Sequence, residues 1–298
     1  MSPADPAPAA RDPQPGGPQP GDLQPPDLRS REPQPLESQP LAPRPHRVTA
    51  LVTGATAGIG RSFAVALARQ GYDVVLVARD AQRLSDLAAQ LEATYGVAGE
   101  TLPADLADRD ALRRVEERVA DPDRPVDLLV NNAGFGLKRP FLDNDVEQEQ
   151  AMLDVLVTAV MRLSHAALRA MVARERGAVV NVSSVAGYLP RGTYSAAKAY
   201  VTSFTEWADL TYRGRGVRAM ALLPGFTRTE FHDRMEVDPG SAPRWMWLDA
   251  DRLVEEALAD LAGGRRVSVP SRRYKALAFL ARATPASMQA RFQGLGRR

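Results

Sequence analysis

From Arg47 onward, short runs of apolar and often β-branched residues alternate with longer stretches in which apolar residues recur every three or four positions. The short runs predict buried strands, and the longer stretches predict amphipathic helices. The predicted strands lie at residues 50–52, 74–77, around Leu102, 127–130, 178–182 and 217–222. The predicted helices lie at residues 62–70, 81–95, 108–120, 145–173 and 194–213, with another beginning near Asp249.

Strands that are apolar throughout, separated by helices, indicate a parallel sheet with helices on both faces. The handedness rule for such crossovers then predicts a doubly wound α/β fold. One domain accounts for the whole pattern, and we place it at residues 46–270.

Residues 1–45 have a different composition, with Pro-Gln-Pro at 13–15, 18–20 and 33–35 and few large apolar side chains. Such a segment cannot bury enough surface to offset its ordering entropy, so we predict a disordered tail with polyproline II character. It contains no apolar core of the signal-peptide type. No later stretch is expected to be apolar for the ~20 residues that a membrane span needs.

The chain contains no cysteine, which excludes disulfides, thiolate nucleophiles and zinc–thiolate sites. We expect a cytoplasmic protein, because a chain without disulfides is compatible with a reducing compartment. His46, His165 and His232 are too scattered to indicate a metal site. The formal net charge is only +2 and no recognition motif is present, so a nucleic-acid partner is not expected.

The strongest chemical signal is the pair Tyr194 and Lys198, which lie four residues apart in a predicted helix and so share one face. A nearby ammonium can lower the pKa of a phenol by roughly one to three units, which would let the phenol exchange a proton near neutral pH. Ser184 follows the strand at 178–182 and would hold a carbonyl or alcohol oxygen. An isolated pair at this spacing more often decorates a helix, so the other motifs decide its meaning.

The first strand runs directly into Thr-Gly-Ala-Thr-Ala-Gly-Ile-Gly at residues 53–60 and then into a helix. Glycines permit a tight turn and close backbone approach to a pyrophosphate, whose charge the helix N-terminus favours. Residues 129–134 form a second strand that ends in small residues, and they belong at the same edge of the sheet.

These motifs, in this order, resemble those of the short-chain dehydrogenase/reductase family in its shorter single-domain form. Residues 53–60 match its Thr-Gly-x-x-x-Gly-x-Gly, 131–134 its Asn-Asn-Ala-Gly and 224–229 its Pro-Gly segment, and Ser184 with Tyr194 and Lys198 matches its serine and Tyr-x-x-x-Lys. The resemblance covers about residues 47–270. It implies a Rossmann-type fold and an NAD(P)-dependent oxidoreductase that interconverts an alcohol and its carbonyl.

The resemblance also implies a role for each matching residue. Tyr194 would be the general acid/base, Lys198 would lower its pKa and bind the nicotinamide ribose, and Ser184 would orient the substrate oxygen. Asp105 and Leu106 would lie near the adenine. The other cofactor-binding residues that it implies are Gly54, Thr56, Gly58, Ile59, Gly60, Asn132, Ala133, Gly134, Pro224, Gly225, Thr227 near the carboxamide and Thr229 near the pyrophosphate.

One residue departs from the family pattern. The family usually carries an asparagine in the helix after Asn-Asn-Ala-Gly, where this chain has Leu156. That asparagine helps to hold a water between the lysine and solvent, so its loss puts the proton relay in doubt. Hydride transfer does not need it directly.

Cofactor choice depends on the residues that follow the second strand. A carboxylate there would bind the 2′-hydroxyl of NAD, whereas an arginine accommodates the 2′-phosphate of NADP. The chain has Ala78 and then Arg79, so NADP is favoured over NAD. Asp80 is interpreted as a helix cap. An ordinary surface arginine is the competing interpretation of Arg79.

Aromatic and apolar residues follow the Pro-Gly segment, in a stretch that forms a mobile lid in the family. With residues 188–190 on the opposite wall, they would line a cleft for a small hydrophobic carbonyl or alcohol. Core or subunit contacts are the alternative, and a homodimer or homotetramer is expected. These residues are Phe226, Phe231, Trp245, Met246 and Trp247.

Residues 265–298 contain nine Lys/Arg residues and no Asp or Glu, interleaved with Tyr274, Leu277, Phe279 and Leu280. We interpret residues 271–298 as a basic helical extension. A basic amphipathic helix can lie on an anionic membrane. Packing over the active site or a partner subunit is the preferred interpretation.

Three functional hypotheses follow: an NADP-dependent oxidoreductase, a nucleotide-binding regulator that has lost turnover, and a membrane-surface scaffold. Leu156 motivates the second. The presence of Ser184, Tyr194 and Lys198 together favours the first, because nucleotide binding alone does not require the serine opposite the tyrosine.

Overall fold

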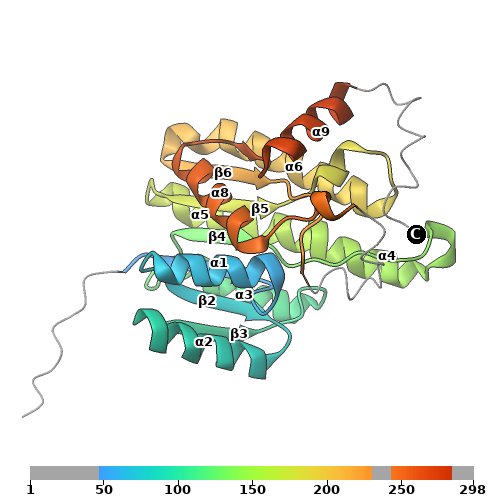
Figure 1. Ribbon diagram of the computed structural model, residues 1–298. Coiled ribbons are helices and arrows are strands. Elements are labelled where there is room, and N and C mark those ends of the chain that lie inside the picture. Colours follow the sequence, from blue (N-terminus) through green and yellow to red (C-terminus); the bar gives the residue numbers. More distant parts are fainter. Residues whose placement is uncertain (1–46, 230–242, 284–298) are drawn as a thin grey trace, which may run out of the picture. The chain divides into compact units, whose positions relative to one another are not determined.

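The computed structural model describes residues 47–229 and 243–283. The predicted tail, Phe231 and residues 284–298 lie outside the described residues. Seven parallel strands form one sheet in the order β3-β2-β1-β4-β5-β6-β7, with helices on both faces (Figure 1). This confirms the doubly wound, Rossmann-type α/β fold. The strands are β1 (Thr49–Thr53), β2 (Asp73–Ala78), β3 (Gly99–Pro103), β4 (Leu128–Asn131), β5 (Gly177–Val182), β6 (Val217–Leu222) and β7 (Val267–Ser268).

The helices that connect these strands begin mostly at aspartate caps. Asp80, Asp108, Asp145 and Asp249 each accept a hydrogen bond from a backbone N–H in the first turn of the helix that follows. The helices are α1 (Gly58–Arg69), α2 (Ala81–Tyr95), α3 (Arg109–Ala120), α4 (Val146–Leu153), α5 (Val160–Ala173), α6 (Thr193–Tyr212), α8 (Ala250–Ala262) and α9 (Arg272–Ala283).

The core has two parts, one on each face of the sheet, and the strands contribute side chains to both of them. Along β1, Ala50 and Val52 belong to the cluster under α1, α2 and α8, whereas Leu51 belongs to the cluster under α3 and α5. All three residues are fully buried. Because successive side chains of a strand point to opposite faces, a strand buried on both faces must be apolar throughout.

The helix predicted at 145–173 contains an irregularity. A π-helical stretch, Asp154–Ala159, separates α4 from α5. By length and composition, Val146–Ala173 could cross a membrane, so the expectation that no stretch would qualify was wrong. Half of its most apolar window is buried inside the domain, where Leu163 and Met171 pack beneath the sheet. Part of the apolar content of this helix is therefore used in the core.

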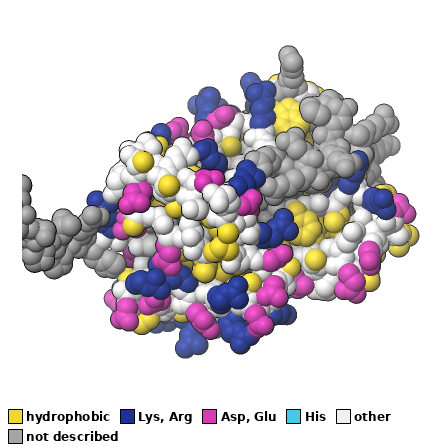
Figure 2. Space-filling model, turned by 90° about the horizontal axis from the view of Figure 1, so that it is seen from below, with side chains coloured by type: hydrophobic (Ala, Val, Ile, Leu, Met, Phe, Trp, Pro, Cys, Tyr) yellow, Lys and Arg dark blue, Asp and Glu magenta, His cyan; other side chains and the backbone are white. Residues whose placement is uncertain are grey.

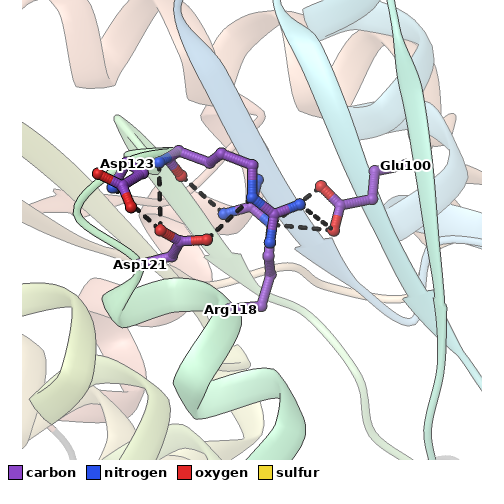
Figure 3. Close-up of polar contacts among 5 residues, drawn as sticks. Glu100, Arg118, Asp121 and Asp123 are labelled. Carbon is purple, nitrogen blue, oxygen red and sulfur yellow. Dashed lines mark hydrogen bonds and ion pairs between the residues drawn. The ribbon is translucent and has the colours of Figure 1, made fainter.

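At the edge of the sheet where the strands begin, here called the amino edge, a group of ion pairs connects α3 to β3 (Figure 3). The Nε of Arg118 lies 2.9 Å from both carboxylate oxygens of Glu100, and its Nη1 donates to the carbonyl oxygen of Arg124 at 2.7 Å. Arg124 in turn pairs with Asp121. On the face shown in Figure 2, acidic and basic side chains are interspersed in the same way.

Candidate active site

The carboxyl ends of four neighbouring strands carry the predicted motifs. In the sheet order β1-β4-β5-β6, these ends lead into residues 53–60, Asn132–Gly134, Ser184 and the Pro-Gly segment at 224–229. Because parallel strands end at one edge, the four motifs meet there. The chain departs in opposite directions from β1 and β4, and such a switch point is where ligands of doubly wound sheets bind.

The glycine-rich turn is held by Thr53 and Asn132. The Thr53 Oγ1 accepts hydrogen bonds from the backbone N–H groups of Asn132 at 2.9 Å and Ala133 at 3.0 Å. The Asn132 Nδ2 donates to the carbonyl oxygens of Thr53 at 2.9 Å and Gly54 at 3.3 Å. A Cβ on Gly60 would lie 2.2 Å from the Gly54 oxygen, so only glycine fits. The sequence did not assign a role to Thr53, since its partners lie 79 and 80 residues away.

The N-terminus of α1 is left open for an anion. Its N-cap residue, Ala57, makes no side-chain hydrogen bond, and the first turn contains no acidic residue. Gly54 and Gly58 have φ angles of +66° and +50°, which other residues rarely adopt. A Cβ on Gly58 would lie 2.8 Å from the Cβ of Thr229, which places Thr229 beside the turn. These residues fit the pyrophosphate of a dinucleotide.

The residues predicted for the adenine end lie where β2 and β3 end. Arg79 is exposed, and Asp80 accepts from the backbone N–H of Arg83 at 3.0 Å, which is the predicted cap. Leu106 is 6% exposed and packs in the core cluster under α3 and α5. Arg83 was not predicted: its Nη2 donates to the Thr56 carbonyl oxygen at 3.2 Å, which places a second guanidinium beside the turn.

Ser184, Tyr194 and Lys198 lie together beyond β5. Tyr194 makes a side-chain hydrogen bond with Ser184. The Lys198 Nζ lies 5.8 Å from the centre of the Tyr194 ring and donates to the Val182 carbonyl oxygen at 2.7 Å. The Ser183 hydroxyl donates to the Lys198 carbonyl oxygen at 2.7 Å, so β5 fixes the helix that carries both residues.

The protonation of this group differs from the expectation. Burial raises the pKa of Tyr194 to about 12, although the hydrogen bond with Ser184 acts in the opposite direction. Burial lowers the pKa of Lys198 to about 8. The predicted lowering of the tyrosine pKa by the ammonium does not occur in this structure, because burial raises the pKa of Tyr194 and outweighs the hydrogen bond with Ser184. Near neutral pH, Tyr194 is a protonated phenol that can donate to a developing alkoxide.

Leu156 forms part of an apolar wall beside the lysine. It is fully buried in the π-helical stretch and clusters with Met152 and Ala197, against which Tyr194 packs. A Cβ built on Gly134 would lie 2.7 Å from the Leu156 Cδ2 and 3.9 Å from the Lys198 Nζ. The leucine side chain and the Lys198 ammonium thus both lie beside Gly134, where the apolar surroundings disfavour charge.

Aromatic residues flank the site on its other side. The rings of Phe226 and Trp247 lie 5.7 Å apart, and Trp245 is 53% exposed. Thr227 forms a bridge with Leu248, and its hydroxyl donates to the Gly225 carbonyl oxygen at 3.1 Å. No group of three His, Cys, Asp or Glu residues that could hold a metal occurs in the described ranges.

A family model described as short chain dehydrogenase matches residues 48–239, so the chain belongs to the short-chain dehydrogenase/reductase family of oxidoreductases. Very-long-chain 3-oxoacyl-CoA reductase-A of Danio rerio is 35% identical over 191 residues, which are 61% of this chain. This chain spans only 58% of that relative.

Two solved structures show the same similarity. A short-chain dehydrogenase from Sphingobium yanoikuyae in complex with NADPH is 35% identical, with a TM-score of 0.73 over 79% of this chain and 94% of that one. The bulky-bulky ketone specific alcohol dehydrogenase from Comamonas testosteroni is 30% identical, with a TM-score of 0.70 over 80% and 92% of the two chains.

Proposed function

We propose that this oxidoreductase prefers NADP and interconverts a hydrophobic alcohol and its carbonyl. The observation that carries the proposal is the group of Ser184, Tyr194 and Lys198 at the edge where the glycine-rich turn begins α1. A nicotinamide cofactor supplies or accepts the hydride in this chemistry. Tyr194, as a neutral phenol, donates the proton to the carbonyl oxygen in reduction, and Ser184 orients that oxygen. The same groups act in reverse in oxidation.

A hydrophobic substrate is supported by the surroundings of Tyr194. The tyrosine packs against a cluster that includes Met152 and Leu156, with Phe135 and Leu137 at its margin. A site with apolar walls and a few polar groups suits a substrate whose single polar centre is its carbonyl. The similarity to an alcohol dehydrogenase described as specific for bulky-bulky ketones points the same way.

The NADP preference is supported by the charges at the end of β2. The carboxylate of Asp80 is used to cap α2, while the Arg79 side chain is exposed and Arg83 reaches the Thr56 carbonyl oxygen. A guanidinium can bind a 2′-phosphate with two hydrogen bonds, but it gains little from a ribose hydroxyl. One similar structure was solved in complex with NADPH.

A panel of aliphatic and aromatic ketones and aldehydes, followed by NADPH absorbance, tests the function. We expect turnover that increases with the apolar surface of the carbonyl compound. Turnover of small polar carbonyls alone would contradict the substrate class. If the wild type turned over no carbonyl while binding NADPH, the nucleotide-binding regulator would replace the enzyme as the better proposal.

Arg79→Ala tests the cofactor preference. We expect NADPH binding to weaken by about ten- to one-hundredfold and NADH binding by less than about threefold, because only the phosphate contact is lost. Arg69→Ala is the matched control, since it removes an exposed guanidinium from the other end of α1. Fluorescence titration measures both dissociation constants. Equal losses for the two cofactors would show that Arg79 does not bind the 2′-phosphate.

We also propose that α6 contributes to a homodimer. Tyr200, Phe204 and Trp207 form a row of ring contacts on this helix, with centroids 5.9 and 5.7 Å apart, and Trp207 is 50% exposed. Exposed aromatic rows favour association. Light scattering with Trp207→Glu checks this: the variant should be monomeric if α6 forms the interface, and an unchanged molar mass would contradict it.

A further inference from the structure

The C-terminal helix α9 reaches the cofactor side of the site through one residue. Tyr274 is 3% exposed, whereas Arg272, Arg273 and Lys275 on either side of it are exposed. The Tyr274 hydroxyl accepts a hydrogen bond from the backbone N–H of Phe226 at 2.9 Å and donates to the carbonyl oxygen of Met246 at 2.8 Å. Residues 272–283 lie beyond the part of the chain that the family model matches.

These two hydrogen bonds extend a short ladder. The Leu248 N–H donates to the Phe226 carbonyl oxygen at 2.7 Å, and the Arg228 N–H donates to the Leu248 carbonyl oxygen at 3.0 Å. The Tyr274 hydroxyl joins the same two segments one step further back, at Phe226 and Met246. It thereby gives a hydrogen-bond partner to the Phe226 N–H, next to Thr227, and to the Met246 carbonyl oxygen.

Gly225 makes room for this tyrosine. A Cβ at Gly225 would lie 1.9 Å from the Cζ of the Tyr274 ring, so any side chain there would displace the ring. The family resemblance assigns Gly225 to the cofactor-binding residues. The structure shows a second reason why this position is glycine: the Tyr274 ring of α9 occupies the space that a side chain would need.

The helix also touches the turn that follows the catalytic serine. α9 contacts the 3₁₀ turn Val185–Tyr188, whose N-cap is Ser184. The backbone N–H of Val185 donates to the Pro224 carbonyl oxygen at 3.1 Å. One element therefore borders both the Pro-Gly segment and the serine turn.

We propose that Tyr274 is a positioning residue that holds the Pro-Gly segment, and with it Thr227 and Thr229, in place for the cofactor. Thr229 packs against Gly58 at the N-terminus of α1, so a shift of the segment would change the surface that a pyrophosphate meets. Burial raises the pKa of Tyr274, so its hydroxyl keeps its proton at neutral pH and can both donate and accept. The inference rests on the nicotinamide cofactor of the proposed function.

Tyr274→Phe tests the proposal, because it keeps the ring and removes only the hydroxyl. We expect the backbone amides of residues 225–229 to exchange hydrogen several times faster in the cofactor-free protein. We also expect NADPH to bind about three- to tenfold more weakly. Tyr72→Phe, at the opposite edge beside the start of β2, is the matched control and should change neither quantity.

The two measurements separate the possible roles. A merely structural tyrosine would lower the melting temperature and leave the dissociation constant of the folded protein unchanged, which would overturn the proposal. Unchanged hydrogen exchange would also overturn it. If the wild type binds neither NADPH nor NADH, the proposed function fails instead, and the exchange rates alone decide whether Tyr274 holds the segment.

A double-mutant cycle between Gly225 and Tyr274 tests the close contact itself. Gly225→Ala should weaken NADPH binding by about tenfold or more, because the new methyl group displaces the ring. In a Tyr274→Ala background the same substitution should cost less than about threefold, since the space is then free. A full loss in both backgrounds would show that Gly225 is needed by the ligand rather than by Tyr274.

Discussion

The two edges of the sheet use charge in opposite ways. At the amino edge, Arg118 is almost fully buried and its guanidinium is bound by Glu100 and by the carbonyl oxygen of Arg124. At the carboxyl edge, Arg79 is exposed, and no carboxylate within residues 47–229 and 243–283 forms an ion pair with it. The amino edge satisfies its polar groups within the chain, whereas the carboxyl edge presents some of them to solvent.

The helices that follow the strands all begin at the carboxyl edge, and there the start of α1 differs from the others. α2, α3, α4 and α8 begin with an aspartate that accepts a backbone hydrogen bond, but α1 begins at Ala57 and Gly58 without one. A carboxylate cap would stabilise α1 and would repel a phosphate from the same N–H groups. The buried ion pairs of Arg118 and the open start of α1 lie at opposite ends of the strands, so we expect substitutions at the first to affect stability and substitutions at the second to affect cofactor binding.

The largest expected effect is on the carboxyl edge, from Tyr194→Phe. We expect kcat to fall by about a thousandfold, equivalent to about 4 kcal/mol, because the transferable proton is lost while the ring keeps its packing. The NADPH dissociation constant and the melting temperature should change little. Steady-state kinetics with an active carbonyl compound provide the measurement. A variant that keeps more than a tenth of wild-type kcat would exclude Tyr194 as the proton donor.

The amino edge should respond in the opposite way to Arg118→Ala. Removing a nearly buried guanidinium leaves the Arg124 carbonyl oxygen without its donor and Glu100 with only its longer contact to Arg124, so we expect the free energy of unfolding to fall by about 2–3 kcal/mol. NADPH binding at a temperature where the variant is folded should be unchanged. Urea denaturation and cofactor titration measure the two effects.

Arg113→Ala on the same helix is the control for this substitution. Arg113 pairs with Asp110 three residues away, and both side chains are mostly exposed, so the expected loss is below about 0.5 kcal/mol. Equal destabilisation by the two substitutions, or weaker NADPH binding in the Arg118 variant alone, would break the proposed separation of the two edges.

The sequence predicted the fold because strands buried on both faces leave an unambiguous pattern. The helix at 81–95 was predicted at its observed bounds, and the six longer strands were found within about two residues at most ends. β7 was missed because it has two residues, too few to show a pattern. The π-helical stretch was missed because one extra residue in a turn does not disturb an apolar run.

The sequence predicted those parts of the site in which the functional residues lie within one short motif. It did not predict the contacts between residues that are far apart in the sequence. Helical spacing placed Tyr194 and Lys198 on one face, but it contained no information on their loss of solvent, which decides both pKa values. Thr53 and Tyr274 act through partners far away in the sequence. Only the fold shows that these contacts exist.

The buried lysine should produce a pH dependence of stability. Its pKa is lowered from 10.5 to about 8 in the folded chain, so between these values the unfolded chain binds more protons and the free energy of unfolding rises with pH. Tyr194 acts in the opposite direction only above about pH 10, where the unfolded phenol begins to ionise.

Lys198→Met isolates this effect. Between pH 7.5 and 9.5, cofactor-free wild type should gain about 2 kcal/mol relative to the variant, as measured by urea denaturation at each pH. The comparison of the two proteins removes the contributions of all other titrating groups. Parallel stability profiles would mean that Lys198 keeps its ordinary pKa in the folded chain.

The smallest expected effect concerns Leu156, where the carboxyl edge departs from its family. The leucine is fully buried, and its side chain and the Lys198 ammonium both lie beside Gly134, so the leucine presents an apolar surface where an amide could hold a water. Leu156→Asn should therefore raise kcat for alcohol oxidation by about two- to fivefold below pH 8, where loss of the Tyr194 proton limits the rate. NADP binding should not change.

Leu153→Asn is the control for this substitution, because Leu153 packs at the margin of the same cluster and lies one turn earlier. Both variants place an amide in apolar surroundings and should lose some stability, but only the change at Leu156 should alter kcat. The alkaline rise of the kcat–pH profile should move to lower pH, since an amide oxygen that stabilises the ammonium makes the neighbouring phenol easier to ionise. Coincident profiles for wild type and Leu156→Asn would mean that another group already connects Lys198 to solvent, and the leucine would then be a packing residue without consequence for proton transfer.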